Sequence, residues 1–329
     1  MKLFITGASG FVGGAVVEHL RDRHQIKAMS RTIGSDDVIK ALGAEPVRCD
    51  LNSISAQQLA GCDCVIHAAA RAEDWGKYDW FYQTNVVGTE KLLQVAREAG
   101  VKRFIFVGTE SALFYGRDLL NVDESAAYAL DSPYPYAKTK ALAEQAVLRA
   151  NSRDFATLSL RPCMVWGPKD QSILPVLLAT IDKGNFAWIN GGEYPVSTTF
   201  VGNFCHAVDL ALEGAGGEAY FITDNENTSL KEFFEKLLAT QGVKAPDKTV
   251  PAWLLRTLAF CIEKLYAVFA GDRRPPLTRF AAAILSSART INIEKARRDL
   301  GYEPIYSREQ GLALMTESQS TDTSFNLTP

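Results

Sequence analysis

Two overlapping Tyr-x-x-x-Lys pairs in the middle of the chain could carry out acid–base chemistry. Tyr134 is spaced to pair with Lys138, and Tyr136 with Lys140. Pro135 suits the first position of a helix and biases Tyr134 toward an extended conformation, so Tyr136 and Lys140 would share one helix face. An ammonium beside a phenol lowers the phenol pKa, so this pattern predicts an acid or base that works near neutral pH. The alternative is an ordinary helix start with two surface lysines.

Ser111 is a further hydroxyl that could take part in this chemistry. It follows the apolar run 103–107 in the sequence G-T-E-S-A-L-F-Y-G. A hydroxyl just past the carboxyl end of a strand lies where doubly wound α/β folds bind their ligands. We therefore expect Ser111 and Tyr136 to face the same ligand.

The first elements of the chain would position a nucleotide beside these residues. The apolar run 3–5 predicts a buried strand, and it leads through G-x-x-G-x-x-G into an amphipathic segment. Gly7 permits a tight turn, Gly10 lets the backbone approach a pyrophosphate, and Gly13 lets the helix pack on the strand. Strand, turn and helix N-terminus together predict a dinucleotide site. The residues expected to form it are Gly7, Ser9, Gly10, Phe11, Val12 and Gly13.

The first half of the chain alternates strand and helix patterns, which predicts an α/β fold with a Rossmann-type, doubly wound parallel sheet. Strands are predicted at 25–30, 46–48, 62–67, 103–107 and 155–160, and helices within 38–42, 73–100 and 135–150. Residues 1–165 form the expected dinucleotide-binding domain, with later returns near 200–222 and 289–303. Residues 166–315 are expected to form a smaller, mainly helical substrate lobe, and 316–329 a disordered tail.

The end of the second predicted strand bears on the choice of cofactor. A carboxylate at this place would bind the ribose 2′-hydroxyl of NAD, but the chain has Ser30 and Arg31. A hydroxyl and a guanidinium suit a 2′-phosphate, which favours NADP(H) and leaves NAD(H) possible. The alternative for Arg31 is a surface arginine that caps a loop. Asp50 and Leu51, after the third strand, are placed either to meet the adenine or to start a helix.

Composition and charge limit the kinds of partner. The chain of 329 residues has a formal net charge of −3, which argues against nucleic acid because phosphate binding needs a basic face. Its six cysteines form no CxxC pair and no metal-ligand spacing with histidine, so we expect no metal site. Cys62 and Cys64 come at the start of an apolar strand and are expected to be buried free thiols. The initiator Met leads directly into the first strand, so no secretory signal is expected and a reduced, cytoplasmic setting is predicted.

Several motifs occur together in a characteristic order. They are T-G-A-S-G-F-V-G, H-A-A-A, N-V-V-G-T from Asn85, S-A-L-F-Y-G, Y-A-K-T-K and L-R-P-C-M-V-W-G-P, which extend over about the first 170 residues. Weaker matches follow, namely P-L-T-R-F near Arg279 and K-A-R-R-D-L-G-Y-E-P. With these motifs the sequence resembles the extended short-chain dehydrogenase/reductases, and in particular the 3β-hydroxysteroid dehydrogenase-like branch of the epimerase/dehydratase superfamily.

The resemblance implies roles for individual residues. Tyr136 would exchange a proton with the alcohol or ketone oxygen, Ser111 would hold that oxygen, and Asn85 would support a proton relay. Lys140 would lower the Tyr136 pKa and bind the nicotinamide ribose together with Tyr136. Thr109 is a second candidate hydroxyl that could contact the substrate, because the family usually has a run of serines before Ser111. Further cofactor contacts are implied for Ala68, Ala69, Ala70, Pro162, Cys163 and Val165.

The chain departs from nucleotide-sugar enzymes of the same superfamily. Those relatives usually place an asparagine after the L-R motif and an arginine before a later strand, whereas this chain has Cys163-Met164 and Ser197–Thr199 there. Without such groups a polyanionic substrate would be poorly bound. Trp75 and Tyr78 depart from these enzymes too and resemble bacterial sterol-dehydrogenase-like reductases. They would either flank an apolar substrate or pack under a helix.

The segment 251–271 is rich in bulky apolar residues, but charged residues interrupt it, so it does not fit a membrane span. It predicts a lid over an apolar pocket, a helix at a membrane surface, or a core helix pair. The helices that carry Leu92 and Leu142 are expected to pair in a homodimer, as in many relatives.

These observations predict an NADP(H)-dependent oxidoreductase that interconverts a secondary alcohol and a ketone on a small apolar substrate, sterol-like or 3-ketoacid-like. One alternative is a nucleotide-sugar epimerase or dehydratase. Another is a cofactor-sensing or scaffold protein that has lost the chemistry, which the intact Ser111, Tyr136 and Lys140 oppose.

Overall fold

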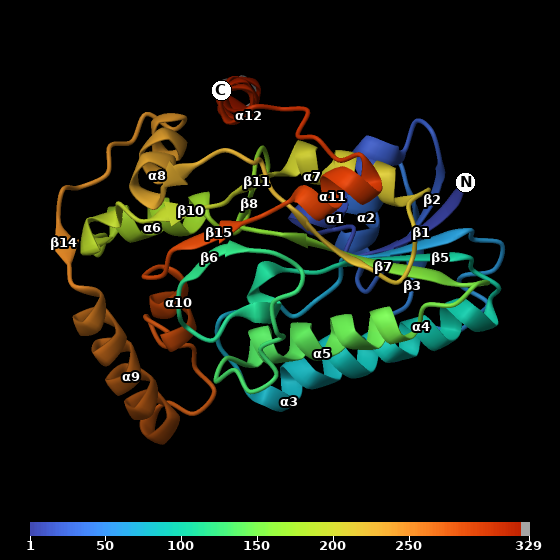
Figure 1. The fold of residues 1–329 in the computed structure, drawn as a ribbon, viewed down its shortest axis with the longest axis horizontal. Coiled ribbons are helices and arrows are strands. Elements are labelled where there is room, and N and C mark those ends of the chain that lie inside the picture. The colour runs from blue at the N-terminus through green and yellow to red at the C-terminus, as the bar shows by residue number, and fades with distance from the viewer. Residues whose placement is uncertain (324–329) are drawn as a thin grey trace.

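A computed structural model describes residues 1–323, and its centre is a seven-stranded parallel sheet of order β12-β7-β5-β4-β1-β2-β3 (Figure 1). The strands are β1 (Lys2–Thr6), β2 (Gln25–Ser30), β3 (Glu45–Arg48), β4 (Cys64–His67), β5 (Arg103–Val107), β7 (Ala156–Pro162) and β12 (Ala219–Ile222). Their apolar runs are almost continuous because helices cover both faces of the sheet. The predicted doubly wound sheet is confirmed. Strand order reverses between β1 and β4, which creates a crevice at their carboxyl ends.

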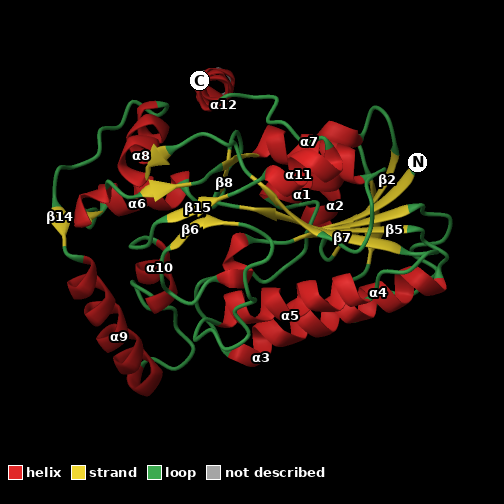
Figure 2. Cartoon of the chain, in the orientation of Figure 1, coloured by secondary structure: helices red, strands yellow, loops and turns green. Residues whose placement is uncertain are grey.

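The helices form two layers on opposite faces of this sheet (Figures 1 and 2). One layer contains α1 (Phe11–Leu20), α2 (Ile33–Ala41), α7 (Val201–Ala211) and α11 (Glu294–Leu300). The other contains α3 (Tyr78–Phe81), α4 (Gly88–Glu98) and α5 (Pro135–Arg149). The helix predicted within 73–100 begins only at Tyr78, and a π-helical turn, Tyr82–Val87, joins α3 to α4. Such turns are frequent at functional sites, and this one carries Asn85.

The second lobe combines helices with short strands. Its helices are α6 (Leu174–Asp182), α8 (Leu230–Ala239), α9 (Ala252–Phe269), α10 (Arg279–Ile284) and α12 (Arg308–Thr323). A four-stranded sheet has the order β13 (Thr228–Ser229), β10 (Pro195–Val196), β15 (Arg289–Ile291) and β6 (Leu119–Val122). Two strand pairs complete the lobe, β8 (Val165–Trp166) with β11 (Thr199–Phe200) and β9 (Trp188–Ile189) with β14 (Thr249–Val250). Strand β6 comes from the first half of the chain, so the two lobes share this sheet.

The disordered tail expected from residue 316 is wrong as far as Thr323, because helix α12 continues to that residue. Two apolar side chains near its start, Leu312 and Met315, pack against the core of the second lobe. The remaining residues, 324–329, lie outside the described residues. The sparse apolar positions of α12 gave no periodic signal in the sequence, although two of them suffice to attach the helix.

Helix α9 is not a core helix, so that interpretation of the segment 251–271 is wrong. Of its residues only Ala259 is buried, while bulky apolar side chains such as Trp253, Val268 and Phe269 are 69, 72 and 82% exposed. Its charged residues Arg256 and Glu263 instead hydrogen-bond to other parts of the lobe. Within residues 1–323, no helix is long and apolar enough to span a membrane.

Candidate active site

The turn between β1 and α1 has the geometry that a dinucleotide site requires. Gly7 has a φ of 73°, and a side chain there would come within 2.7 Å of the Ala69 nitrogen. A Cβ at Gly13 would lie 2.2 Å from the Gly7 carbonyl oxygen, so the close approach of helix and turn needs glycine. At Gly10 a Cβ would meet only the Gly7 oxygen, at 3.4 Å, which leaves its outer side open to a ligand.

A groove runs from this turn along the carboxyl ends of β1, β2, β3 and β4. It is lined by Gly7, Ser9, Gly10, Met29, Arg31, Ser35, Asp50, Leu51, Asn52, Ala68, Ala69, Ala70, Gln83 and Thr84. The structure thus brings together half of the predicted cofactor residues, nine of eighteen, in one groove. It adds Met29, Ser35, Asn52, Gln83 and Thr84, which belong to no motif and gave no signal in the sequence.

Some residues predicted for the cofactor lie outside the groove lining. Ser30 is buried, and its hydroxyl donates to the carbonyl oxygen of Thr32 at 3.2 Å. Val12 packs on the main core, Gly13 is buried in α1, and Phe11 lines a smaller neighbouring cavity. Among the segment after β7, Pro162 and Cys163 are buried, and Val165 starts the short strand β8.

Helix α5 begins as the sequence predicts. Tyr134 is its extended N-cap, with φ −103° and ψ 114°, and Pro135 is the first helical residue. One turn into the helix, Lys140 is only 3% exposed, and its ammonium donates to the Val107 oxygen at 2.7 Å. The ammonium also lies 3.9 Å from the ring centroid of Phe106. Burial lowers the pKa of Lys140 to about 7, against a smaller opposite effect of the nearby Glu144 carboxylate.

Tyr136 lies at the start of α5 and is partly buried. Burial, and to a smaller extent the negative charge of Glu110, raise the pKa of its phenol, while a hydrogen bond with Thr109 lowers it. Lys140 is not among the groups that shift the Tyr136 pKa, because its ammonium is bound to β5. The expected lowering of the Tyr136 pKa by Lys140 is therefore absent from this arrangement of the two side chains. At neutral pH Tyr136 is protonated and equipped to act as an acid.

The candidate hydroxyls lie in a short 3₁₀ turn, Glu110–Leu113, that follows β5. Ser111 is buried, and its backbone N–H donates to the Thr109 hydroxyl at 3.2 Å. The Thr109 hydroxyl donates in turn to Glu110 Oε2 at 2.9 Å. Glu110 Oε1 accepts from Arg289, on strand β15, at 3.0 Å. Sequence reasoning gave Glu110 no role and missed Arg289, which lies far away along the chain.

Asn85 connects the loop after β4 to helix α5. Its side-chain oxygen accepts from the Arg71 N–H at 2.7 Å, and its amide donates to the Arg71 oxygen and to Thr139 Oγ1, both at 3.1 Å. Since Asn85 hydrogen-bonds to the Arg71 backbone and to Thr139 of α5, it fixes the loop after β4, which leads from the groove toward Tyr136. Its place in the π-helical turn points the side chain at this loop.

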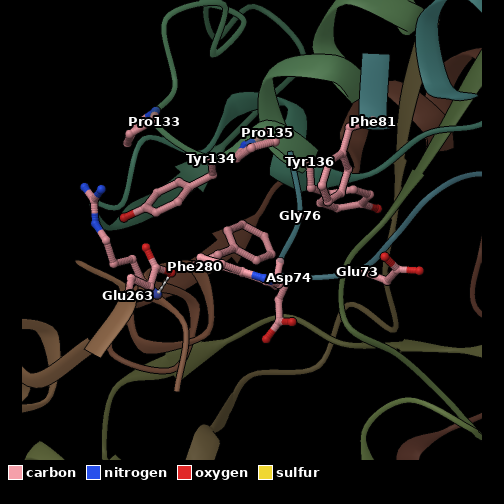
Figure 3. A pocket seen from close by; sticks show the side chains of 12 residues that line it. Glu73, Asp74, Gly76, Phe81, Pro133, Tyr134, Pro135, Tyr136, Glu263 and Phe280 are labelled. Atoms are coloured by element: carbon pink, nitrogen blue, oxygen red, sulfur yellow. Dashed lines mark hydrogen bonds between the residues drawn. The ribbon is translucent and has the colours of Figure 1, made fainter. Parts of the chain in front are cut away.

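A cavity lies beside Tyr136, between that loop and helices α5, α9 and α10 (Figure 3). It is lined by Glu73, Asp74, Trp75, Gly76, Phe81, Pro133, Tyr134, Pro135, Tyr136, Glu263, Arg279 and Phe280. Trp75, which was predicted to contact the substrate, thus lies in the lining of this cavity. Tyr78 is not in the lining. Its ring lies tilted against that of Tyr82, with 5.7 Å between the centroids, and under the Lys138 ammonium.

Phe280 is the main residue of this cavity that sequence reasoning missed. Its ring centroid is 5.3 Å from that of Tyr134 and 5.9 Å from that of Tyr136, and Figure 3 shows it between the two tyrosines. The only sequence signal was the weak match P-L-T-R-F, to which no role was given. The cavity therefore presents aromatic rings to a ligand that contacts Tyr136.

Comparisons with known proteins agree with this architecture. Residues 4–252 match the 3-beta hydroxysteroid dehydrogenase/isomerase family. The chain is 38% identical over 322 residues (97% of this chain and 96% of the relative) to 4-hydroxy-2-methyl-3-oxo-4-farnesyl-3,4-dihydroquinoline-1-oxide ketoreductase of Stigmatella aurantiaca. It is 35% identical to 2-alkyl-3-oxoalkanoate reductase of Stenotrophomonas maltophilia, over 97% of this chain and 100% of that protein.

The fold also resembles a solved structure of UDP-glucuronic acid 4-epimerase from Bacillus cereus in complex with NAD. The TM-score is 0.74 at 20% identity, over 98% of this chain and 99% of the other, which supports the fold alone. The chain belongs to the 3-beta hydroxysteroid dehydrogenase/isomerase family and is an oxidoreductase of the extended short-chain dehydrogenase/reductase type.

Proposed function

We propose that the chain is an NADP(H)-dependent oxidoreductase that interconverts a secondary alcohol and a ketone on an apolar, sterol-like or 3-ketoacid-like substrate. The observation that carries this proposal is the place of Tyr136. Its ring lines the aromatic cavity, and a single loop connects Ala68–Ala70 in the nucleotide groove to Glu73–Gly76 in that cavity. The names of the ketoreductase and oxoalkanoate reductase relatives support the same chemistry.

The residues of the groove fit a nicotinamide dinucleotide. Side chains at Gly7 and Gly13 would meet backbone atoms, and only Gly10 leaves open space toward the groove, where a pyrophosphate would bind. When bound, the cofactor supplies or accepts a hydride. Tyr136 gives its phenol proton to the ketone oxygen during reduction and takes it back from the alcohol during oxidation. Ser111 would hold that oxygen, and Lys140 would bind the nicotinamide ribose.

The preference for NADP(H) rests on Arg31. Its side chain is exposed in the groove lining together with Ser35. Hydrogen bonds from Ser53 lower the pKa of Asp50, and the positive charge of Arg31 adds a smaller effect in the same direction. No carboxylate stands at the end of β2, where an NAD-specific site would need one. Replacing Arg31 by Ala should weaken the binding of NADPH much more than that of NADH. Equal losses in a fluorescence titration with both cofactors would exclude the 2′-phosphate contact.

The nucleotide-sugar alternative is disfavoured by the environment of the two positions at which such enzymes bind phosphate. Cys163 is fully buried. Thr199 Oγ1 accepts from the Cys163 N–H at 2.9 Å and donates to the Ile222 oxygen at 2.7 Å. Thr198 donates to Asp224 at 2.8 Å. These hydroxyls hold the protein together and are not free for a pyrophosphate.

Turnover is tested by following the absorbance of NADPH with a panel of ketones and keto acids. We expect oxidation of NADPH with apolar ketones, and no oxidation across a broad panel would favour the sensor or scaffold alternative. Tyr136→Phe should remove turnover and leave the NADPH dissociation constant nearly unchanged. Retained activity would contradict the role of Tyr136.

We also propose that the outward face of α9 contacts a lipid surface. Leu258, Leu265, Val268 and Phe269 are exposed on this face, while the charged Glu263 points toward α10. An apolar face of this kind is typical of helices that lie in a membrane interface. Vesicle flotation should recover the protein with phosphatidylglycerol-containing liposomes, and Val268→Glu with Phe269→Glu should abolish recovery. Equal recovery of this variant would contradict the lipid contact.

Homodimer formation through α4 and α5 remains part of the proposal. Leu92 is buried within the protomer, so polar residues such as Lys91 and Gln94 would have to form the surface of contact on α4. Sedimentation equilibrium should give twice the mass of one chain. A single-chain mass at micromolar concentration would contradict it.

A further inference from the structure

We propose that Arg279 and Tyr134 form a binding subsite for a carboxylate at the end of the cavity away from Tyr136. The preferred substrate is then an apolar ketone that carries an acidic group at its far end. This subsite rests on the proposed function, because it belongs to the cavity in which Tyr136 meets the ketone. Arg279 comes from the motif P-L-T-R-F, and it has no part in the mechanism given above.

Tyr134 and Tyr136 lie on opposite sides of the Phe280 ring (Figure 3). The ring centroid of Phe280 is 5.3 Å from that of Tyr134 and 5.9 Å from that of Tyr136, and all three residues line the same cavity. In Figure 3 the hydroxyl of Tyr134 points away from Tyr136. A substrate whose ketone oxygen contacts Tyr136 would therefore extend along Phe280, and its far end would reach Tyr134.

Two polar groups at this far end have no partner in the protein. Within residues 1–323, neither the Tyr134 hydroxyl nor the Arg279 guanidinium forms a hydrogen bond or an ion pair. Arg279 is half-buried, and its guanidinium carbon lies over the ring of Phe260, 5.4 Å from the centroid. A guanidinium that lies over a ring keeps the N–H groups at its edge free, and their planar arrangement matches the two oxygens of a carboxylate.

Two of the acidic residues in the cavity are neutralised by other arginines. The described lining contains three carboxylates, those of Glu73, Asp74 and Glu263. Glu73 is paired with Arg71. Arg274 donates to both oxygens of Asp74, at 2.8 and 2.7 Å. These two carboxylates therefore each have a cation of their own and do not need Arg279.

Glu263 is the one carboxylate that competes with a substrate for Arg279. Its Oε1 accepts from the backbone N–H of Arg279 at 2.6 Å, but no ion pair joins the two side chains in the described part of the chain. Burial raises the pKa of Glu263, which weakens it as a competing anion. Since Arg279 is the only basic residue among the described residues of the lining, a carboxylate in the cavity meets one unpaired cation.

The place of Arg279 limits where the carboxylate of the substrate can be. Burial raises the pKa of Tyr134 and the Arg279 charge opposes this rise, whereas Arg279 is not among the groups that shift the pKa of Tyr136. In a 3-keto acid a single methylene separates the carbonyl from the carboxylate, which is too short to pass the Phe280 ring. The subsite therefore selects keto acids with a longer apolar chain between the two groups.

The test follows NADPH oxidation with methyl ketones that end in a carboxylate, with two to seven methylenes between carbonyl and carboxylate, beside their methyl esters. For the longer chains the wild-type protein should favour the acid over its ester about tenfold in kcat/KM, because only the acid forms charge-assisted hydrogen bonds. The shortest acids should show no such preference. Equal use of acid and ester at every chain length would overturn the proposal.

Arg279→Met should reduce this preference about tenfold. The matched control is Arg273→Met, which removes the same charge from an exposed residue of the same segment and should leave the preference unchanged, because exposed charges are screened. A ratio between two substrates does not change when a variant merely loses activity, so it separates carboxylate binding from structural damage. A preference that is retained in Arg279→Met would overturn the proposal.

Tyr134→Phe and Glu263→Gln provide a second route if Arg279→Met does not fold. Tyr134→Phe loses one hydrogen-bond donor and should reduce the preference about threefold. Glu263→Gln removes the competing charge and keeps an oxygen that accepts from the Arg279 N–H, so the preference should rise. A fall in Glu263→Gln, or an unchanged preference in both variants, would contradict the subsite.

A failure of the proposed function would give a different result. If the wild-type protein oxidises NADPH with no ketone of the series, the proposed function is overturned, and the subsite is then tested by calorimetric titration of the NADPH-loaded protein with octanoate. Octanoate should bind about tenfold more weakly to Arg279→Met than to the wild-type protein. No binding to the wild-type protein, or equal affinity for both proteins, would overturn the subsite.

Discussion

Replacing Gly10 or Gly13 by Ala should separate cofactor binding from folding. Gly10 has φ −95° and ψ 174°, a conformation that any residue adopts, and an added Cβ would meet only the Gly7 oxygen at 3.4 Å. Gly10→Ala should therefore fold with an unchanged melting temperature. The new methyl group would occupy the space into which the pyrophosphate must come, which makes it a probe of the cofactor alone.

The size of the effect follows from the contact distances. Forcing a methyl group into a well-packed contact costs about 1–3 kcal/mol, which weakens cofactor affinity roughly 5- to 150-fold. In Gly13→Ala the added Cβ would lie 2.2 Å from the Gly7 oxygen and 2.6 Å from the Gly7 carbonyl carbon. Both are backbone atoms that cannot move aside, so the helix has to shift. The free energy of unfolding should fall by about 3 kcal/mol, the upper end of that range.

The assay combines NADPH fluorescence titration with thermal unfolding followed by circular dichroism. Gly34→Ala is the matched control, because a Cβ there meets nothing within 4 Å and Gly34 is outside the groove lining. NADPH affinity that is unchanged in Gly10→Ala would refute the placement of the pyrophosphate at this glycine. An unchanged melting temperature in Gly13→Ala would refute the argument from helix packing.

Three further predictions concern the interior, the cavity and pH. Glu144→Ala should lower the free energy of unfolding by about 3–5 kcal/mol in urea denaturation, because it leaves the buried Arg161 guanidinium uncompensated; an additional Arg161→Met should restore part of the loss. Phe280→Ala should raise KM for a bulky apolar ketone about tenfold with little change in NADPH affinity, and an unchanged KM would place the substrate elsewhere. Burial lowers the pKa of Lys140 from 10.5 to about 7, so between these pH values the unfolded chain binds one proton more than the folded chain, and the free energy of unfolding rises with pH. Between pH 7 and pH 9 this rise should be about 2 kcal/mol larger in the wild-type protein than in Lys140→Met, as measured by urea denaturation at each pH. An equal dependence of stability on pH in both proteins would contradict the burial of the ammonium.

Local patterns were sufficient to predict the elements around the proposed cofactor groove. The β1 strand, the glycine turn, Ser30 at the end of β2 and Pro135 at the start of α5 depend on interactions between neighbours in the chain. Apolar runs and glycine spacing therefore predict these elements from the sequence alone. Some elements begin or end a few residues away from their predicted bounds. Strand β4, for example, begins at Cys64 and not at Cys62.

Contacts between distant segments were not predictable in the same way. Arg289 meets Glu110 only because β15 lies next to β6, and no spacing in the sequence connects them. Phe280 reaches Tyr136 from a six-residue helix that is too short for a periodic signal. The long apolar pattern of α9 was visible, but whether its residues are buried depends on what packs around the helix, and only Ala259 is buried.

Strand β6 gives the second lobe a direct connection to the acid–base residues. Its residues, 119–122, lie between Ser111 and Tyr136 in the sequence, and they pair with β15 (Arg289↔Leu119 and Ile291↔Val122). The link is reinforced where Asp118 accepts from the Ala288 N–H at 2.9 Å and Thr290 Oγ1 accepts from the Asn121 N–H at 2.7 Å. The second lobe also carries Arg289, which donates to Glu110 Oε1 at 3.0 Å. The turn that contains Ser111 is therefore attached to the second lobe through the Arg289–Glu110 ion pair, and the chain segment that follows this turn is attached through the pairing of β6 with β15.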